Sequence, residues 1–265
     1  MSTTAANDRF SGLSRLYGEQ GLTALSQAHV AVIGIGGVGS WTSEALARSG
    51  VGELTLVDLD DVCVTNTNRQ IHALTSTVGR PKVEVMGQRI SAINPDCRIH
   101  MENQFFNEKT VAAILDRPLH GVIDAIDVVR PKCLLLAQCH RRGIPVITCG
   151  AAGGRSRATL IQVADLSRTF NDALLHQVRK NLRTNYAFPS GKGSRKKFGI
   201  TAVFSPEDVR YPKGDGSVST DRPNHLTAGL RCDGGLGAVT HLTATFGLLA
   251  AGEIVNLLAE PKPDA

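Results

Sequence analysis

A glycine-rich loop between an apolar segment and a helical segment constrains the fold of this chain most strongly. Residues 29–40 read HVAVIGIGGVGS, and helical spacing of apolar residues continues to Arg48. Val30–Ile33 has the composition of a buried parallel strand. A strand that turns through glycines into a helix lets a phosphate approach bare backbone N–H groups at the helix N-terminus. The predicted nucleotide-binding residues of this loop are Gly34, Gly36, Gly37, Val38, Gly39 and Ser40. The loop alone does not distinguish a redox cofactor from ATP.

Strand-like and helical segments alternate from the loop to residue 152. Further strands are predicted at 53–57, 98–101, 122–126 and 146–149, and helices at 15–28, 38–48, 82–93, 109–115 and 131–142. This alternation predicts a parallel sheet with right-handed crossovers, in which ligands bind at the carboxyl ends of the strands. Gly39, Asp58 and Asp127 are each expected at such an end, so we expect one pocket to hold all three.

The pattern changes after residue 152. Strands are predicted at 159–163 and 200–204, helices at 172–182 and 236–259, and a long loop at 205–230. We therefore expect one large α/β, Rossmann-like domain, in which a parallel nucleotide-binding half is continued by a mixed or antiparallel half. The chain divides into an N-terminal helical arm at 1–28, a nucleotide-binding half at 29–152 and a second half at 153–265.

Composition favours a folded protein without a membrane span. Hydrophobic residues make up 42% of the 265 residues, and the formal net charge of +5 is compatible with a polyanionic partner. None of the six cysteines forms a Cys-x-x-Cys pair, which argues against a structural zinc site with cysteine ligands. The first ten residues are polar, so we expect a cytoplasmic protein. The apolar segment 236–259 contains His241, Glu253 and Asn256, which favours a buried or dimer-facing helix over membrane association.

The residues that follow the second predicted strand favour ATP over a redox cofactor. Asp58 lies about 20 residues after the glycine loop, where a carboxylate accepts hydrogen bonds from the ribose of either nucleotide. Asn66 and Arg69 share a face of a helical turn, and a guanidinium can bind two phosphate oxygens. Lys82 adds a positive charge at the start of a helix, and Asp127 offers a carboxylate suited to Mg²⁺. Each residue alone is typical of a surface salt bridge, but the combination favours a triphosphate.

These residues resemble the motifs of the ubiquitin-activating-enzyme-like adenylyltransferases. The similarity rests on the loop 34–40, on Asp58, Asp60 and Val62, on Asn66, Arg69 and Gln70, and on Lys82. It implies ATP and Mg²⁺, attack of a carboxylate on the α-phosphate, an acyl-adenylate and release of pyrophosphate. The implied site residues are Asp58, Asp60 and Gln70 at the nucleotide, Asn66, Arg69 and Lys82 at the phosphates, Asp127 at Mg²⁺, and Arg9, which reaches the γ-phosphate from a partner subunit.

Further segments resemble a narrower branch, the tRNA threonylcarbamoyladenosine dehydratases. The carrier-protein activators commonly contain two Cys-x-x-Cys pairs, and this chain has none. The similar segments are Arg9–Gly18, Cys149–Gly154, Asp165–Thr169, Val203–Glu207 and Leu236–Ala259. The resemblance implies ATP-dependent cyclisation of threonylcarbamoyladenosine at tRNA position 37 through an adenylated threonine carboxylate. It also implies a homodimer, and it assigns tRNA binding and dimerisation to 153–265. A monovalent cation (Na⁺ or K⁺) and a cysteine desulfurase with its sulfur acceptor are further expectations.

A basic cluster in the second half fits an RNA partner. It consists of Arg179, Lys180, Arg183, Lys192, Arg195, Lys196 and Lys197, with Tyr186 and Phe188 between them. Cations for phosphates and aromatic rings for stacking suit an RNA loop, although a solvated charged face is the alternative. Cys232 lies in a glycine-rich loop, where an exposed reactive thiol and an inert one are both open.

Two other functions are compatible with the same motifs. One is an adenylyltransferase that activates the C-terminus of a ubiquitin-like sulfur-carrier protein, and the other is an NAD-dependent reductase. The substrate separates them, because only the dehydratase turns over with tRNA that carries the modified base.

Overall fold

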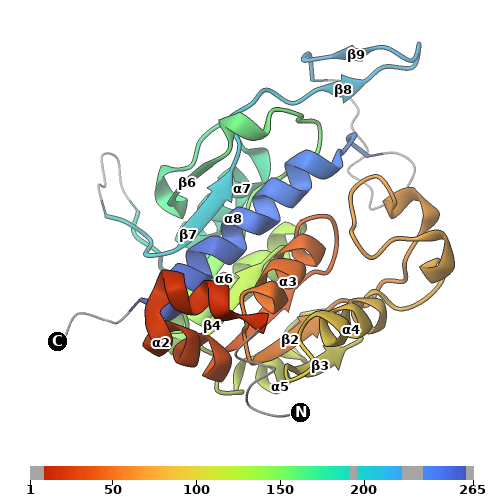
Figure 1. Cartoon of the computed structure of the whole chain (residues 1–265). Coiled ribbons are helices and arrows are strands. Elements are labelled where there is room, and N and C mark those ends of the chain that lie inside the picture. The colour runs from red at the N-terminus through yellow and green to blue at the C-terminus, as the bar shows by residue number, and fades with distance from the viewer. Residues whose placement is uncertain (1–8, 191–195, 223–234, 261–265) are drawn as a thin grey trace.

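The centre of the fold is a seven-stranded sheet (Figure 1). The computed structural model describes residues 9–190, 196–222 and 235–260. The strands are β1 (His29–Ile33), β2 (Glu53–Val57), β3 (Arg98–Glu102), β4 (Gly121–Asp124), β5 (Val146–Cys149), β6 (Gln162–Asp165) and β7 (Thr201–Phe204). Their order is β3-β2-β1-β4-β5-β7-β6, in which β6 and β7 are antiparallel and the other neighbours are parallel. This arrangement confirms the predicted Rossmann-like α/β fold with a mixed second half.

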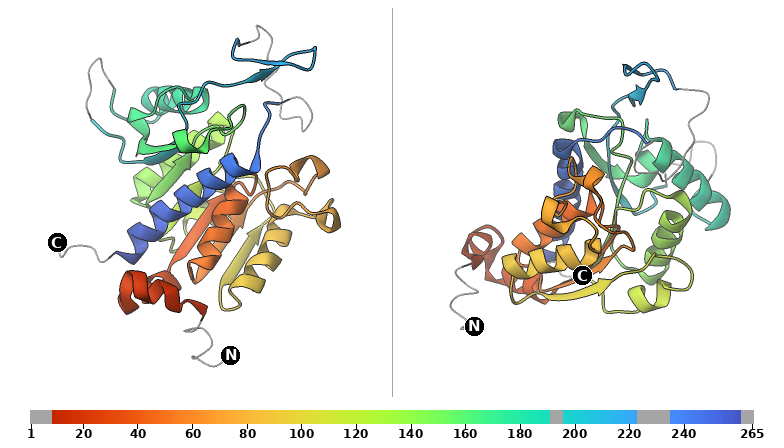
Figure 2. Two further views of the ribbon diagram at one scale, coloured as in Figure 1. Left: turned by 45° about the horizontal axis from the view of Figure 1, so that its top comes forward. Right: turned by 90° about the vertical axis from the view of Figure 1, so that its right-hand side faces the viewer.

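Helices cover both faces of the sheet (Figure 2). One layer contains α2 (Ser11–Gln27), α3 (Gly39–Arg48), α4 (Lys82–Ile93) and α8 (Thr240–Ala259), and the other contains α5 (Val111–Leu115), α6 (Val129–Arg142) and α7 (Ala173–Asn185). Because side chains alternate along a strand, Val30 and Val32 of β1 pack against the first layer. Ala31 and Ile33 pack against the second layer. Burial on both faces explains why β1 is a continuous apolar run.

Short elements complete the described part of the chain. They are the 3₁₀ helices η1 (Val64–Asn66), η2 (Thr75–Thr77), η3 (Ala158–Leu160) and η4 (Leu166–Arg168), and the hairpin of β8 (Tyr211–Pro212) and β9 (Val218–Ser219). The hairpin lies within the segment 205–230, which the sequence predicts to be a loop, and residues 223–230 are outside the described ranges. Helix α2 is interrupted at Gly18, where φ is 73°.

The long apolar helix α8 is a core helix. Within the described residues it is the one helix long and apolar enough to cross a membrane. It lies against α3 (Figure 1), and its Leu242, Phe246 and Ile254 are fully buried. A Cβ atom at Gly247 would lie 2.5 Å from the Val38 carbonyl oxygen, so this close approach requires glycine. The packing confirms the predicted buried helix, which begins at Thr240.

Two predicted strand boundaries are wrong. The segment 159–163 overlaps η3, and β6 begins only at Gln162. β6 is an edge strand whose register depends on antiparallel pairing with β7, and local composition does not encode such pairing. β4 ends at Asp124, because the Asp124 side chain accepts a hydrogen bond from the Ile126 backbone N–H at 3.1 Å and turns the chain. Asp127 therefore lies in the turn after the strand.

Candidate nucleotide-binding site

The glycine loop between β1 and α3 requires glycine at both ends. Gly34 has a φ of 91°, and a Cβ atom there would lie 3.0 Å from the Ala125 carbonyl oxygen. A Cβ atom on Gly39 would overlap the carbonyl oxygen of Gly34. Among the described residues, the backbone N–H groups of Gly36 and Gly37 have no protein acceptor. Free N–H groups at the start of α3 can bind phosphate oxygens.

The Asp58 side chain links the glycine loop to the end of β2 by a hydrogen bond. Its Oδ2 accepts a hydrogen bond from the Ile35 backbone N–H at 2.6 Å, and its Oδ1 accepts one from the Asp60 N–H at 2.9 Å. The buried Lys82 donates to Asp60 Oδ2 at 2.8 Å and lies 3.9 Å from Asp58 Oδ1. Burial raises the pKa of Asp58, and the Lys82 charge opposes that rise. The two carboxylates therefore hold an ammonium group beside the loop, where it can bind phosphate.

Arg69 lies over the glycine loop. Its Cγ atom is 3.5 Å from the position that a Cβ atom on Gly37 would occupy. Its Nη1 donates to the Thr65 carbonyl oxygen at 2.8 Å and to Asn68 Oδ1 at 3.0 Å. Among the described residues no acceptor contacts the other guanidinium nitrogens, so they can bind a ligand.

Two buried amides near the loop have different surroundings. Asn66 Oδ1 accepts a hydrogen bond from the Cys63 backbone N–H at 3.0 Å, so this side chain caps η1. Gln70 Oε1 and Ser40 Oγ are buried without a hydrogen-bond partner in the described ranges. Gln70 Nε2 lies 3.9 Å from the position of a Cβ atom on Gly36. Unsatisfied polar groups beside the loop indicate a polar ligand.

The start of α8 holds the segment around Arg69 in place. Thr240 Oγ1 donates to the Asn68 carbonyl oxygen at 2.5 Å, and Thr243 Oγ1 donates to that of Arg69 at 3.2 Å. Trp41 Nε1 from α3 donates to the same Arg69 oxygen at 3.1 Å. Sequence reasoning assigned these side chains no role. Thr240 and Asn68 are 172 residues apart, so no local pattern predicts their contact.

A buried ion pair shapes the turn that carries Asp127. Lys132 Nζ lies 2.9 Å from Asp124 Oδ2, and both side chains are fully buried. Thr148 Oγ1 donates to the same carboxylate at 2.7 Å, and Lys132 donates to the Ile126 carbonyl oxygen at 2.9 Å. Burial raises the pKa of Asp124, and Lys132 opposes the rise. Sequence reasoning missed this pair. Asp127 itself is exposed at the carboxyl edge of the sheet.

The three expected site segments meet at that edge. Asp58 contacts the loop directly, and a Cβ atom on Gly39 would lie 3.4 Å from that of Ala125 in the turn after β4. Free backbone N–H groups and the two cationic side chains described above suit phosphates. The exposed Asp127 offers a carboxylate for Mg²⁺ bound to those phosphates. The donor set fits a nucleoside triphosphate with Mg²⁺.

A protein-family model matches almost the whole chain. The match covers residues 10–265 and is to the ThiF family. The chain belongs to the ThiF family. It is 47% identical over 257 residues to a tRNA threonylcarbamoyladenosine dehydratase of Escherichia coli K12, with 95% of this chain and 94% of the relative covered. A Haemophilus influenzae protein of the same name is 47% identical over 254 residues, with 96% and 94% covered.

A solved structure is similar over the same length. The E. coli tRNA N6-threonylcarbamoyladenosine dehydratase in complex with ATP has a TM-score of 0.82 at 44% identity, and the match covers 95% of this chain and 94% of that chain. The likeness extends over both the nucleotide-binding half and the second half. A protein of this ThiF-family fold therefore binds ATP.

Two segments that carry the family resemblance meet in this ThiF-family chain. The buried Arg155 donates to three backbone carbonyl oxygens, one of which belongs to Glu207. The Glu207 carboxylate accepts hydrogen bonds from the backbone N–H groups of Ser156 at 3.0 Å and Arg157 at 2.7 Å. These bonds tie the loop after β5 to the loop after β7 at the carboxyl edge. The family resemblance includes both segments, but the sequence does not indicate that they are in contact.

Arg9 does not reach the nucleotide site of its own chain. Its Nη1 donates to the Ile93 carbonyl oxygen at 2.9 Å, at the C-terminal end of α4. Lys82 is the first residue of α4, and a helix of 12 residues is about 17 Å long. In this ThiF-family chain, the role implied for Arg9 at the γ-phosphate therefore requires a second subunit.

Two members of the predicted basic cluster, Lys196 and Lys197, lie at the opposite, amino edge of the sheet. Asp165 pairs with Thr201 at the amino end of β7, and its carboxylate accepts a hydrogen bond from the Phe198 backbone N–H at 3.0 Å. Lys196 and Lys197 precede this point and are exposed. The glycine loop lies beyond the other end of the neighbouring parallel strands. Lys196 and Lys197 are therefore on the edge opposite the nucleotide site of the same chain.

Members of the cluster on α7 differ in exposure. Lys180 is exposed. Arg179 is partly buried and donates to Thr169 Oγ1. Arg183 is exposed, but its guanidinium carbon lies 5.0 Å from the centroid of the Phe198 ring and its Nε donates to the Pro189 carbonyl oxygen at 3.3 Å. Lys180 is thus the α7 cation with the greatest freedom to contact a phosphate.

One predicted RNA-stacking ring is unavailable. Phe188 is only 5% exposed, and its ring contacts those of His140 and Phe198. The prediction that it stacks on RNA is wrong, because the end of α7 needs an apolar side chain to close the core. Three other residues singled out from the sequence lie outside the described residues: Lys192, Arg195 and Cys232.

Proposed function

We propose that this chain converts N6-threonylcarbamoyladenosine at tRNA position 37 to its cyclic form, with ATP as the second substrate. The supporting observation is the similarity, over nearly the full length of both chains, to bacterial tRNA threonylcarbamoyladenosine dehydratases. The free N–H groups, cations and unsatisfied amide at the carboxyl edge support ATP binding independently. Molybdopterin-synthase adenylyltransferases are more distant, with 33% identity over 163 residues and 58% of this chain covered.

The geometry suits a reaction driven by position and charge. The loop N–H groups, Arg69 and Lys82 hold the triphosphate, and Asp58 accepts hydrogen bonds from the ribose. One oxygen of the threonine carboxylate attacks the α-phosphorus, and the bond to pyrophosphate breaks. A nitrogen of the substrate then attacks the activated carbonyl carbon and gives up its proton. AMP leaves with the former carboxylate oxygen, as in a cyclising ligase, and no enzyme nucleophile is needed.

We also propose that Asp127 holds Mg²⁺ and that the active unit is a homodimer. Mg²⁺ would neutralise charge on the triphosphate. In the dimer, Arg9 of one chain would contact the triphosphate bound by the other, because it lies far from its own site. A monovalent cation, a sulfur-acceptor partner and a cytoplasmic location stay predictions of the sequence.

The tRNA would contact an exposed lysine of α7 and the two exposed lysines of the amino edge. Lys180, Lys196 and Lys197 offer cations for phosphates. A hollow of about 470 Å³ between α6 and α7 is lined by Arg141 and Tyr186, among others. Strands of four or five residues span only about 13–17 Å, so one RNA molecule can reach both edges of the sheet.

Nucleoside mass analysis tests the proposed reaction. The chain is incubated with ATP, Mg²⁺ and tRNA that carries the modified base, and nucleosides, AMP and pyrophosphate are quantified. We expect the nucleoside to lose the mass of one water while AMP and pyrophosphate form in equal amounts. Transfer RNA without the modification is the control and should give neither product.

Two outcomes would replace the proposal. AMP formation with a Gly-Gly-tailed carrier protein, and none with modified tRNA, would establish carrier-protein activation instead. Binding of NADH without any effect of ATP on the melting temperature would favour a reductase.

A further inference from the structure

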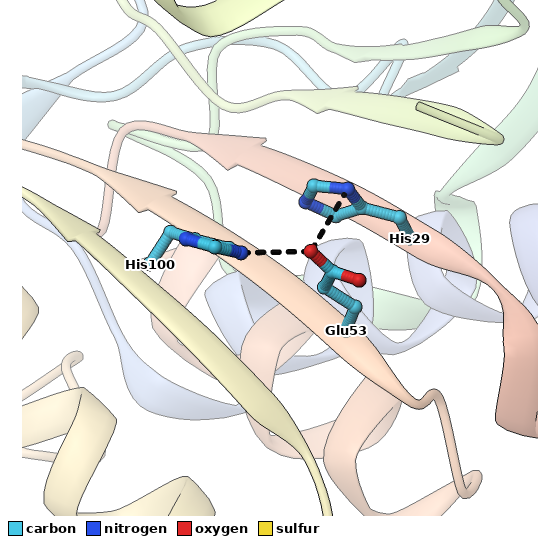
Figure 3. A group of neighbouring side chains, drawn as sticks. All are labelled: His29, Glu53 and His100. Atoms are coloured by element: carbon cyan, nitrogen blue, oxygen red, sulfur yellow. Dashed lines mark hydrogen bonds and ion pairs between the residues drawn. The ribbon is translucent and has the colours of Figure 1, made fainter. Parts of the chain in front are cut away.

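Two histidines and a glutamate converge at the amino edge of the sheet (Figure 3). His29 is the first residue of β1, Glu53 is the first residue of β2, and His100 is in the middle of β3. The strand register places His29 beside Glu53 and Thr55 beside His100. The cluster thus links three neighbouring strands at the edge opposite the glycine loop.

The ligand atoms have the spacing of a metal site. His29 Nδ1 lies 3.4 Å and His100 Nε2 lies 2.7 Å from the same oxygen, Glu53 Oε1. All three ligand atoms lie within 4.8 Å of one another. Tetrahedral Zn²⁺ with ligand distances of about 2.1 Å keeps its ligand atoms roughly 3.4 Å apart. The distance from His29 Nδ1 to Glu53 Oε1 already matches, and the distance from His100 Nε2 to that oxygen needs to lengthen by about 0.7 Å.

The buried Nδ1 atom of His29 lacks a hydrogen-bond partner among the described residues. His29 is 3% exposed, and its Nδ1 has no hydrogen bond among the described residues. Its Nε2 lies 2.8 Å from Thr55 Oγ1, which also accepts a hydrogen bond from Arg117 Nη1 at 3.3 Å. In the tautomer protonated at Nε2, Nδ1 directs its lone pair toward the Glu53 carboxylate, and a cation between the two would be coordinated by both.

We propose that His29 Nδ1, the Glu53 carboxylate and His100 Nε2 bind a divalent transition-metal ion of the zinc class, with water as a fourth ligand. Two imidazoles and one carboxylate suit Zn²⁺ and its neighbours better than Mg²⁺. Metal-binding histidines usually donate their other N–H group to an acceptor, and Thr55 Oγ1, 2.8 Å from His29 Nε2, can accept it.

The site would stabilise the sheet and take no part in nucleotide chemistry. It lies at the far end of β1 and β2 from Asp58 and the glycine loop. Arg98 forms an ion pair with the other oxygen of Glu53, and its charge limits the affinity for a cation. The side chain of Arg98 is 77% exposed and can turn away from the site when the metal binds.

Zinc binding to chelator-treated, tag-free protein tests this site. Equilibrium dialysis with ZnSO₄ in excess MgCl₂, followed by metal analysis, should give one tightly bound Zn²⁺ per chain. The melting temperature should rise with Zn²⁺ and stay constant when MgCl₂ alone is varied, because the metal binds only the folded state. Co²⁺ bound in place of Zn²⁺ should show the visible absorption of a tetrahedral ion.

Two variants and a control decide the assignment. His100→Gln and Glu53→Gln should each weaken Zn²⁺ binding at least tenfold. His100 is partly exposed, so His100→Gln keeps the fold even if Glu53→Gln does not. His176→Gln replaces an exposed histidine on α7 and should bind Zn²⁺ like the parent protein. No binding by the parent, or equal binding by His100→Gln, would overturn the proposal. Neither result depends on turnover of tRNA.

Discussion

The two edges of one sheet differ in how they use charge and backbone groups. At the carboxyl edge, helices begin, and the N–H groups of Gly36 and Gly37 have no protein acceptor among the described residues. At the amino edge, helices end, and the last turn of α6 carries His140, Arg141 and Arg142. Cations there complement the helix dipole. Strand direction therefore separates a nucleotide-binding edge from a basic edge, although both use the same strands.

The largest effect should come from removing the exposed carboxylate at the carboxyl edge. We expect Asp127→Asn to lower AMP formation about a thousandfold or more, because charge stabilisation at phosphates is worth several kcal/mol. The melting temperature should stay unchanged, since Asp127 is exposed. Asp116→Asn, which breaks an exposed ion pair with Arg142 at the amino edge, is the matched control and should keep full activity. Equal activity of both variants would show that Asp127 does not take part in the reaction.

Breaking the buried ion pair between Asp124 and Lys132 should lower the stability of the fold and not only the rate of the reaction. Lys132→Met leaves the Asp124 carboxylate buried without its cation, so the free energy of unfolding should fall by about 3–5 kcal/mol. Urea unfolding measures this change. The double variant Asp124→Leu with Lys132→Met should recover much of the loss, because an apolar pair needs no charge compensation. A mild effect of Lys132→Met would show that water reaches the pair.

The turn that carries Asp127 illustrates how far the sequence predicts the site. β1, the glycine loop and α3 follow from local composition, so the sequence correctly predicts that the glycine loop and Asp58 lie at the carboxyl edge of the sheet. The apolar residues at 122–126 predict a strand past Asp124, whereas the chain turns there. The turn depends on Lys132 in α6, so the local sequence does not indicate it. The contact of Thr240 with Asn68 depends on the final helix returning to α3. Such long-range contacts have no local signal.

The position of the basic cluster was also beyond local reasoning. Composition identified the cluster, but the edge at which Lys196 and Lys197 lie follows from the parallel pairing of β7 with β5, because these lysines precede β7. The antiparallel pairing of β6 then brings Asp165 to the same edge, beside Phe198. Whether a charged segment lies beside a nucleotide or across the sheet from it therefore depends on strand order and direction.

A buried histidine near the carboxyl edge should make the fold sensitive to acid. Burial lowers the pKa of His72 to about 4, and neither ring nitrogen has a hydrogen-bond partner among the described residues. The unfolded chain binds this proton near pH 6.5, so its contribution to stability is lost as pH falls from about 6.5 toward 4. We expect a loss of about 2 kcal/mol by pH 4.5. His72→Phe should show a smaller loss over that range in urea unfolding, and an identical pH profile would contradict the assignment.

Charge reversal at the amino edge should weaken tRNA binding moderately. Lys196→Glu with Lys197→Glu should lower tRNA affinity about tenfold at moderate salt and reduce the salt slope by up to about 2, because two phosphate contacts are lost. Replacement of both by Gln should give a smaller loss of affinity. Filter binding across a salt series measures both quantities. An unchanged slope would mean that these lysines form a solvated face.

The smallest effect should follow from removing the exposed cation beside the proposed metal site. Arg98→Ala breaks an ion pair with Glu53 in which the arginine side chain is 77% exposed, so the metal-free protein should lose less than about 1 kcal/mol of stability. Removing that charge should also raise the Zn²⁺ affinity a few-fold, because one fewer cation repels the ion. Unfolding and dialysis on the same preparation separate the two effects. A large loss of stability of metal-free Arg98→Ala would instead show that the ion pair of Arg98 with Glu53 stabilises the fold. Glu53 would then serve that ion pair and not a metal site with His29 and His100.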